Sequence, residues 1–285
     1  MQTILNILQD AAIDTIKLIP FLFITYLIME YIEHKTSNKL RETIKKSGKF
    51  GPLLGAVVGI FPQCGFSVSA TNLYAGKVIT MGTLIAVYLT TSDEMLPILL
   101  TESVPISTIL TILGIKLLIG IIAGFLVDFI FKIIKKGKNE EEQQIEELCE
   151  HEHCHCDEGI VSSALKHTIN ITIFIFIITL ILNGIITYIG EETIAHFISK
   201  NVILGPVIAG LIGLIPNCAS SVIITELFIE KVISMPILIS GVAVNAGVGL
   251  LVLFKTNKNI KENMSIVGLL YLIGVLAGII LELFL

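Results

Sequence analysis

The chain has 285 residues, of which 54% are hydrophobic and only 15% are charged, and its formal net charge is −5. This balance excludes an ordinary soluble domain, and the apolar residues come in runs rather than at amphipathic spacing. The composition predicts an all-α polytopic membrane protein in contact with the lipid bilayer. No nucleic-acid partner is expected, and the oligomeric state is left open.

The apolar runs have the length of membrane-spanning helices, since about 20 mainly apolar residues cross a bilayer core. Four uninterrupted runs meet this length: 13–31, 107–134, 164–189 and 264–285. Two longer apolar zones, 50–100 and 202–254, are broken by Pro, Gly and small polar residues. No basic stretch precedes the first run, so a cleaved signal peptide is not expected.

The zone 50–100 predicts a helical hairpin followed by one membrane crossing. The limbs of the hairpin are 52–61 and 65–76, its tip is Pro62-Gln63-Cys64, and the crossing starts at Val78. A limb of about 11 residues is roughly 16 Å long at 1.5 Å per residue, which is half a bilayer core. Non-helical backbone at that depth survives only where protein or a water-filled cavity covers it. The tip is therefore expected near the midplane of the membrane.

Polar residues interrupt this crossing at Thr90-Thr91-Ser92-Asp93-Glu94. A carboxylate at membrane depth costs about 2.5–3.5 kcal/mol on insertion scales, so such a group is usually paired or functional. Thr91, Asp93 and Glu94 are therefore candidates for substrate binding. Asp93 and Glu94 are also candidates for coupling to protons or sodium. The alternative is that this polar break lies in water at the membrane interface.

A hydrophilic linker, residues 135–160, follows the last helix of the first half. It carries a run of glutamates and a set of good transition-metal ligands: Cys149, His151, His153, Cys154, His155 and Cys156. Adjacent ligands do not all close on one ion, so the linker predicts a loose metal-capture or sensing segment rather than a rigid structural zinc site. The alternative, a solvated acidic tether, explains the glutamates but not the alternation of His and Cys.

The second half repeats the first with a shift of 154 residues, which places Cys64 on Cys218. The same shift aligns further positions: Gly59 with Gly213, Pro62 with Pro216, Ser67 with Ser221, Thr91 with Asn245, and Asp128 with Glu282. A duplicated apolar unit with an interrupted polar motif indicates a transporter whose site lies between two repeats. The chain is expected to divide into a first membrane repeat (1–134), the linker (135–160) and a second membrane repeat (161–285).

The basic residues predict that the two repeats are inverted. The loop at 35–49 carries six Lys or Arg residues, whereas its counterpart at 190–204 carries only Lys200. Conversely, 101–106 carries none, and the matching stretch 255–261 carries three. Because short basic loops stay in the cytoplasm, we expect the linker inside and both termini outside the cytoplasmic (inner) membrane of a prokaryote. Each repeat then has about three full spans plus a broken or re-entrant hairpin, ten segments in all.

Cys64 and Cys218 occupy the same position in opposite repeats, so an axis in the membrane plane would bring them together. Thiolate is the soft ligand that suits zinc-like ions, copper and trivalent metalloids. Neighbouring polar side chains complete the candidate substrate site: Gln63, Ser67, Asn217, Ser221 and Asn245. Glu226, on the same predicted helix as Cys218, is a weaker candidate for coupling. The alternative for each Cys is a small side chain that fills a tight turn.

The sequence resembles the ten-transmembrane heavy-metal exporters at Pro-Gln-Cys-Gly-Phe-Ser, Pro-Asn-Cys-Ala-Ser-Ser, Thr-Ser-Asp-Glu, Asn-Ala-Gly-Val-Gly and Leu165-Lys166-His167-Thr168. These ArsP-like proteins are variously described as arsenic efflux proteins or manganese transporters. The resemblance covers nearly the whole chain and implies export of a metal or metalloid across the cytoplasmic membrane. Trivalent arsenic favours three thiolates, whereas the membrane region has two cysteines. That leaves room for a divalent cation bound by mixed Cys, carboxylate and amide ligands.

These features predict a secondary transporter and not an enzyme, with alternating access to a midplane site between inverted repeats. No cofactor is required, and a metal ion is expected as the substrate or as a linker ligand. The sequence lacks the Gly-x-x-x-x-Gly-Lys-Ser/Thr motif, so ATP drive would need another subunit. Two alternatives stay open. One is a carrier for a small organic solute with a structural Cys pair and a regulatory metal-binding linker, and the other is a membrane-embedded lipid enzyme.

Overall fold

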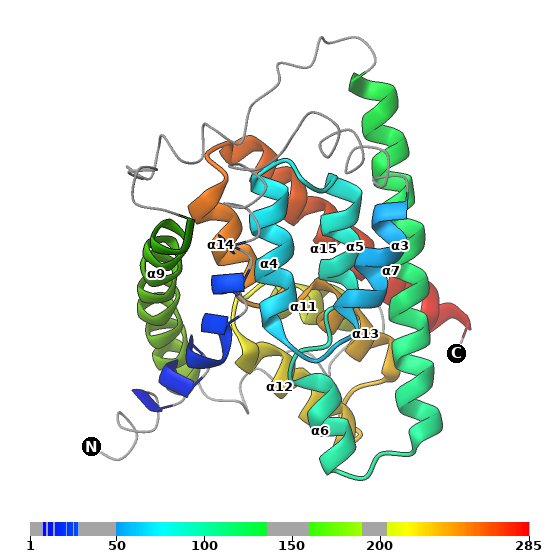
Figure 1. Ribbon diagram of the computed structural model, residues 1–285. Helices are drawn as coiled ribbons and strands as arrows, with labels where there is room; N and C mark the ends of the chain where they lie inside the picture. Colours follow the sequence, from blue (N-terminus) through cyan, green and yellow to red (C-terminus); the bar gives the residue numbers. More distant parts are fainter. Residues whose placement is uncertain are drawn as a thin grey trace.

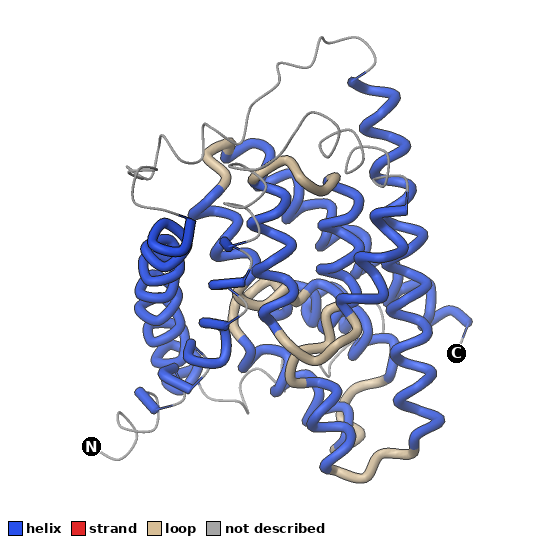
Figure 2. The backbone as a smooth tube through the Cα atoms, in the orientation of Figure 1, coloured by secondary structure: helices blue, strands red, loops and turns tan. Residues whose placement is uncertain are grey.

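The computed structural model consists of α-helices joined by short loops (Figure 1, Figure 2). It describes residues 8–9, 11–13, 15–20, 22–24, 26–27, 50–135, 160–189 and 204–284. This part of the chain contains no strand, and the all-α polytopic fold expected from the sequence is confirmed. Five helical stretches within it are long and apolar enough to cross a membrane: Met81–Thr101, Ile106–Ile133, Ala164–Ile181, Met235–Thr256 and Ile260–Phe284.

The described helices fall into two sets that follow the same order along the chain. The first set is α3 (Gly51–Gly59), α4 (Cys64–Ala75), α5 (Met81–Thr90), α6 (Met95–Thr101) and α7 (Ile106–Lys135). The second set is α9 (Ile160–Ile189), α11 (Leu204–Gly213), α12 (Cys218–Ile229), α13 (Met235–Val244), α14 (Gly249–Thr256) and α15 (Ile260–Phe284).

The helix boundaries coincide after the shift found in the sequence. Helices α4, α5, α6 and α7 start at residues 64, 81, 95 and 106, and α12, α13, α14 and α15 start at 218, 235, 249 and 260, so each difference is 154. The predicted hairpin is confirmed, with α3 and α4 as its limbs. The crossing that follows is broken into α5 and α6. From α3 to α7 and from α11 to α15, the described helices therefore follow the same succession.

Proline and one extended residue create the turn of each hairpin. The proline of each Pro-Gln-Cys or Pro-Asn-Cys motif lacks the N–H that would continue the preceding helix. Gln63 and Asn217 are then extended, with φ and ψ of −159° and 116° and of −147° and 151°. The next helix starts one residue later, at Cys64 or Cys218. Each of these cysteines is therefore the first residue of a helix at a hairpin tip.

A second turn interrupts each crossing. α5 and α13 end where Thr91 and Asn245 leave the helical region, with ψ of 126° and 96°. α6 and α14 start only at Met95 and Gly249. Between α13 and α14, Gly247 has a φ of +54°, a left-handed conformation that favours glycine. Each half therefore has two non-helical segments, the hairpin tip and this break.

Helices of each half pack against helices of the other half. α4 packs against α14 and α12 packs against α6, so the hairpin of each half contacts the broken crossing of the other. α5 and α13 also contact each other, and nearly all their residues are buried. In Figure 1, α7 starts at the bottom and ends at the top, whereas α15 starts near the top and ends at the lower right. These equivalent helices run in opposite directions in that view.

The long outer helices present apolar stripes to their surroundings. Exposed apolar residues recur at a spacing of four: Leu118, Ile122, Leu126 and Ile130 on α7; Ile169, Ile173, Ile177 and Ile181 on α9; Leu272, Leu276 and Ile280 on α15. Residues at this spacing lie on one face of a helix. Continuous apolar faces of this kind are unfavourable in water and suit contact with lipid chains. The central helices are thus enclosed by protein, and the outer ones contact the bilayer.

Glycines let the outer helices approach the central ones closely. A Cβ at Gly124 of α7 would lie 2.7 Å from the Gly82 carbonyl oxygen of α5. At the matching place in the second half, a Cβ at Gly278 would lie 3.0 Å from the Pro236 carbonyl oxygen. Small residues permit this kind of packing between membrane helices. Gly124 and Gly278 therefore have a packing role.

The matched carboxylates Asp128 and Glu282 anchor the starts of the central helices. Asp128 accepts hydrogen bonds from the Thr80 hydroxyl at 2.7 Å and from the Gly82 amide at 2.8 Å, just before and inside the first turn of α5. Glu282 accepts one from the Ser234 hydroxyl, which precedes α13, at 2.8 Å. Negative groups are favourable at helix N-termini. These contacts give both residues a structural role outside the cluster of cysteines.

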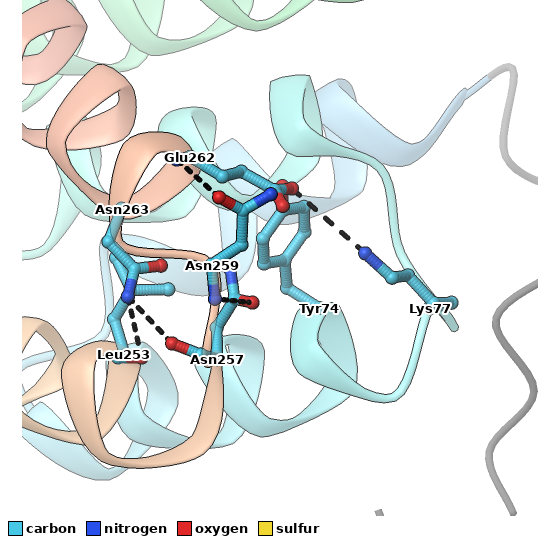
Figure 3. A network of polar contacts seen from close by, with 7 residues as sticks. All are labelled: Tyr74, Lys77, Leu253, Asn257, Asn259, Glu262 and Asn263. Atoms are coloured by element: carbon cyan, nitrogen blue, oxygen red, sulfur yellow. Dashed lines mark hydrogen bonds and ion pairs between the residues drawn. The ribbon is translucent and has the colours of Figure 1, made fainter. Parts of the chain in front are cut away.

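A polar network joins the end of α4 to the start of α15 (Figure 3). The Tyr74 hydroxyl donates to the Glu262 carboxylate, and the Lys77 ammonium lies 4.0 Å from the same group. Asn263 donates to the backbone of the loop between α14 and α15 at 2.7 Å. The residue that matches Tyr74 in the second half is Phe228, which packs in an apolar cluster. The polar contact between the halves at Tyr74 thus has an apolar counterpart at the matching place.

Candidate functional site

Cys64 and Cys218 lie at the tips of the two hairpins and meet inside the protein. Their sulfur atoms are 3.9 Å apart, and both residues are buried. No disulfide joins them, since a disulfide requires about 2.05 Å between the sulfurs. Each residue opens a helix, and the partial positive charge at a helix N-terminus favours an anionic group. The expectation that the two cysteines approach each other is confirmed.

Asp93 adds a carboxylate to the two thiols. One potential ligand atom from each of Cys64, Asp93 and Cys218 lies within 4.8 Å of the other two, and all three residues are buried. Both Asp93 carboxylate oxygens are buried and have no hydrogen-bond partner in the described part of the chain. A buried charged group without a partner is costly, and native proteins rarely retain one. A buried carboxylate whose oxygens accept no such hydrogen bond, beside two thiols, makes this cluster a candidate cation site.

Gly247 explains why the carboxylate comes from one half only. Gly247 is the residue that matches Asp93 in the repeat, since 93 plus 154 is 247. A Cβ on Gly247 would lie 2.7 Å from an Asp93 carboxylate oxygen and 3.8 Å from the Cys64 Cβ. The two breaks therefore meet at the cysteines, and the Asp93 side chain occupies the space that a side chain at 247 would need.

Gly247→Ala is expected to weaken metal binding. The added methyl group meets the Asp93 carboxylate, and the left-handed φ at 247 adds a backbone strain of roughly 1–3 kcal/mol. Gly268→Ala is the matched control, because a Cβ at Gly268 on α15 has no neighbour within 4 Å. Calorimetric titration of the purified variants with Zn²⁺ and their unfolding temperatures check this prediction. Equal zinc affinity in both variants would contradict the assigned position of Asp93.

The predicted serines lie one turn beyond the thiols. The Ser67 hydroxyl donates to the Cys64 carbonyl oxygen at 2.8 Å, and the Ser221 hydroxyl donates to the Cys218 carbonyl oxygen at 2.9 Å. Both serines are buried. Because each hydroxyl proton is bonded within its own helix, these residues brace the first turn that carries the Cys.

The predicted amides surround the cluster with different contacts. Gln63 donates to the Lys17 carbonyl oxygen at 3.4 Å and is half-buried, whereas Asn217 is buried. The Asn245 side chain donates to the Ser220 hydroxyl at 3.0 Å and accepts from the backbone N–H of residue 247 at 2.7 Å. Asn245 therefore holds the left-handed turn that faces Asp93, which is a supporting position.

The other predicted polar residues divide into buried and exposed ones. The Thr91 hydroxyl donates to the Val87 carbonyl oxygen at 2.7 Å, so it is bonded within α5. Glu94 is half-buried at the start of α6. Glu226 lies eight residues after Cys218, about 12 Å along α12 at 1.5 Å per residue, and its side chain is exposed. The structure does not bring Glu226 to the thiols. The predicted linker ligands, 149–156, lie outside the described residues.

Sequence reasoning did not assign a site role to Lys116 of α7. Its side chain is fully buried, and its ammonium donates to the Thr91 carbonyl oxygen at 2.5 Å and to the Val242 carbonyl oxygen at 3.1 Å. It also interacts electrostatically with Asp93. The signal in the sequence was a basic residue near the middle of a 28-residue apolar span, far from the second basic residue at its end, Lys132. Intramembrane charges of this kind are functional candidates by default.

Comparison with known proteins gives a match to one family. Residues 1–191 match the ArsP_2 family model, whose description is "Putative, 10TM heavy-metal exporter". The match covers 191 of 285 residues, about two thirds of the chain. It includes Cys64 and Asp93 and ends before Cys218. The comparisons found no matching curated protein and no matching solved structure.

Proposed function

The chain belongs to this family of ten-transmembrane heavy-metal exporters, and from that premise we propose that it is a secondary transporter that exports a transition-metal ion or metalloid by alternating access. The cargo site is Cys64, Asp93 and Cys218, at the contact between the two halves. In this proposal the halves are inverted repeats, the site lies near the midplane of the cytoplasmic membrane, and the linker is on the cytoplasmic side.

The observation that carries the proposal is the geometry of the thiol pair. A tetrahedral zinc ion with Zn–S bonds of about 2.3 Å separates two thiolate sulfurs by about 3.8 Å. The Cys64 and Cys218 sulfurs are 3.9 Å apart. Together with the Asp93 carboxylate, whose oxygens have no hydrogen-bond partner in the described part of the chain, the pair supplies three ligands and leaves one coordination position for water. An open position is compatible with an ion that must enter and leave.

The ligand set favours a soft or borderline divalent cation. Two thiolates and one carboxylate suit Zn²⁺ or Cd²⁺, whereas Mn²⁺ prefers oxygen ligands. Trivalent arsenic favours three thiolates, and the cluster has two. We therefore propose Zn²⁺-like ions as the cargo class within this family of heavy-metal exporters.

The location of the ligands supports alternating access. One thiol and the carboxylate come from the first half, and the other thiol comes from the second half. The helices that carry them contact the opposite half, α4 on α14 and α12 on α6. A rocking motion of one half against the other would therefore change access to the site without dismantling either hairpin. The His/Cys linker acts in this proposal as a tether that raises the local concentration of the ion.

Transport by sealed vesicles that contain the purified protein tests this function. Zn²⁺, Cd²⁺, Mn²⁺ and arsenite are supplied on one side under imposed proton gradients, with protein-free vesicles as the control. We expect Zn²⁺ and Cd²⁺ to move and Mn²⁺ to stay at the control rate. Movement of none of these ions by well-folded protein, in either orientation, would contradict the proposed function.

A further inference from the structure

Lys116 has an unusual environment for a charged side chain. It is fully buried, and its ammonium donates to two backbone carbonyl oxygens, those of Thr91 and Val242. Among the described residues, no carboxylate lies within ion-pair distance of it, although Asp93 is near enough to interact electrostatically. A buried ammonium held mainly by carbonyl groups resembles an ion in a coordination site more than a partner in a salt bridge.

The two carbonyls belong to the C-terminal ends of equivalent half-helices. Thr91 follows the last residue of α5, and Val242 lies in the last turn of α13. The last carbonyls of a helix have no helical partner and carry partial negative charge. α5 and α13 are repeat mates and pack against each other. Lys116 therefore sits where the negative ends of two broken helices converge.

Such convergent ends commonly bind a coupling cation. In transporters with broken membrane helices, half-helix C-terminal ends and unwound carbonyls coordinate Na⁺ or protons near the substrate. The residue that matches Lys116 in the second half is Leu270, which is fully buried and apolar. The positive charge is thus present once, on the half that also supplies Asp93.

We propose that Lys116 is a tethered cation that occupies this carbonyl site in place of a bound monovalent ion. Building on the proposed function, we further infer that its charge limits the affinity of the Cys64–Asp93–Cys218 cluster for a divalent cargo. An ammonium near the bound ion repels it and offsets the negative charge of Asp93. The cargo is therefore bound weakly enough to be released when access changes.

A change of Lys116 to Met tests the tethered cation through protein stability, which requires no metal. Methionine keeps the length of the side chain but leaves the carbonyl site without a cation. In a buffer whose only cation is the bulky N-methylglucamine, K116M is expected to unfold at a lower temperature than the wild type. Sodium or ammonium chloride should raise its unfolding temperature, because a small cation fills the site. Leu270→Met is the matched control, and neither it nor the wild type should respond.

Two outcomes would overturn the tethered-cation proposal. The first is an unfolding temperature of K116M that is the same in all these salts. The second is a K116M protein that stays unfolded in the presence of every small cation. The proposal requires that such a cation can fill the site that the Lys116 ammonium has left. Lys116→Arg retains the charge, so it is expected to show no dependence on sodium or ammonium.

Zinc affinity tests the second part of the inference. For protein without the linker ligands, K116M in N-methylglucamine is expected to bind Zn²⁺ at least about tenfold more tightly than the wild type, as loss of a nearby like charge implies. Ammonium should reverse this gain. Unchanged affinity in K116M, with zinc bound by the wild type, would overturn the role of Lys116 and leave the proposed function intact. Absence of zinc binding by the wild type would contradict the proposed function and the affinity role together, while the stability measurement still decides the tethered cation.

Discussion

Cys64→Ser and Cys218→Ser are each expected to reduce Zn²⁺ and Cd²⁺ transport in vesicles to the background rate. A metal ion of this class binds thiolate, and the serine hydroxyl stays protonated near neutral pH. The two sulfurs lie 3.9 Å apart, and in the proposed site they serve one ion. Since both residues act on one site, the double variant should be little worse than either single one.

The linker provides the matched control for the thiol variants. Replacement of Cys149, His151, His153, Cys154, His155 and Cys156 by Ser or Ala is expected to reduce total metal binding and to leave some transport. If Cys64→Ser and Cys218→Ser transport normally while Asp93 and Asn245 variants fail, the site is oxygen-based. That result would favour Mn²⁺ or a solute that is not a metal.

Asp93→Asn is expected to have the second largest effect. The carboxylate supplies the only charged oxygen in the described cluster, and its oxygens have no hydrogen-bond partner among the described residues. Removal of a residue that only hydrogen-bonds to a metal ligand typically lowers metal affinity about 10–100-fold. Removal of a direct ligand should therefore lower Zn²⁺ affinity by more than about 100-fold. Calorimetric titration of the linker variant with and without Asp93→Asn measures this.

Glu94→Gln is the control for Asp93, because the neighbouring Glu94 is half-buried and outside the cluster. It should bind Zn²⁺ as the wild type does.

Asp93→Cys offers a gain of function, since it creates the three-thiolate set that trivalent arsenic favours. Arsenite transport by that variant is expected to exceed the wild-type rate. Zinc binding that survives in Asp93→Asn would contradict a three-ligand site.

The repeat in the sequence explains how much of the fold could be predicted. Pro62 and Pro216 are strong local signals, because proline cannot continue a helix. They located both hairpin turns, and with them the thiol pair, since each cysteine occupies the same position in its copy and the two sulfurs lie 3.9 Å apart. The helix boundaries follow the same shift through α15. These features depend on local chemistry and on the duplication, both of which are visible in one sequence.

The remaining features of the site depend on contacts across the halves. The break between α5 and α6 meets the break between α13 and α14 beside the cysteines. This contact places Asp93 close to the thiols and requires glycine at 247. Lys116 reaches carbonyls at the C-terminal ends of α5 and α13, on residues 25 and 126 positions away in sequence. No local pattern encodes such long-range partners. For Glu226 the local sequence was misleading. Its position on the helix of Cys218 suggested a site role, whereas its side chain is exposed.

X-ray absorption at the zinc edge tests most directly whether Cys64 and Cys218 hold one ion. The sample is purified, zinc-loaded protein in which the six His and Cys ligands of the linker have been replaced. We predict two sulfur ligands at about 2.3 Å and oxygen ligands at about 2.0–2.2 Å. The double variant Cys64→Ser, Cys218→Ser should lose the sulfur signal. A zinc ion coordinated by oxygen and nitrogen alone in the protein that retains both cysteines would contradict the shared thiol site.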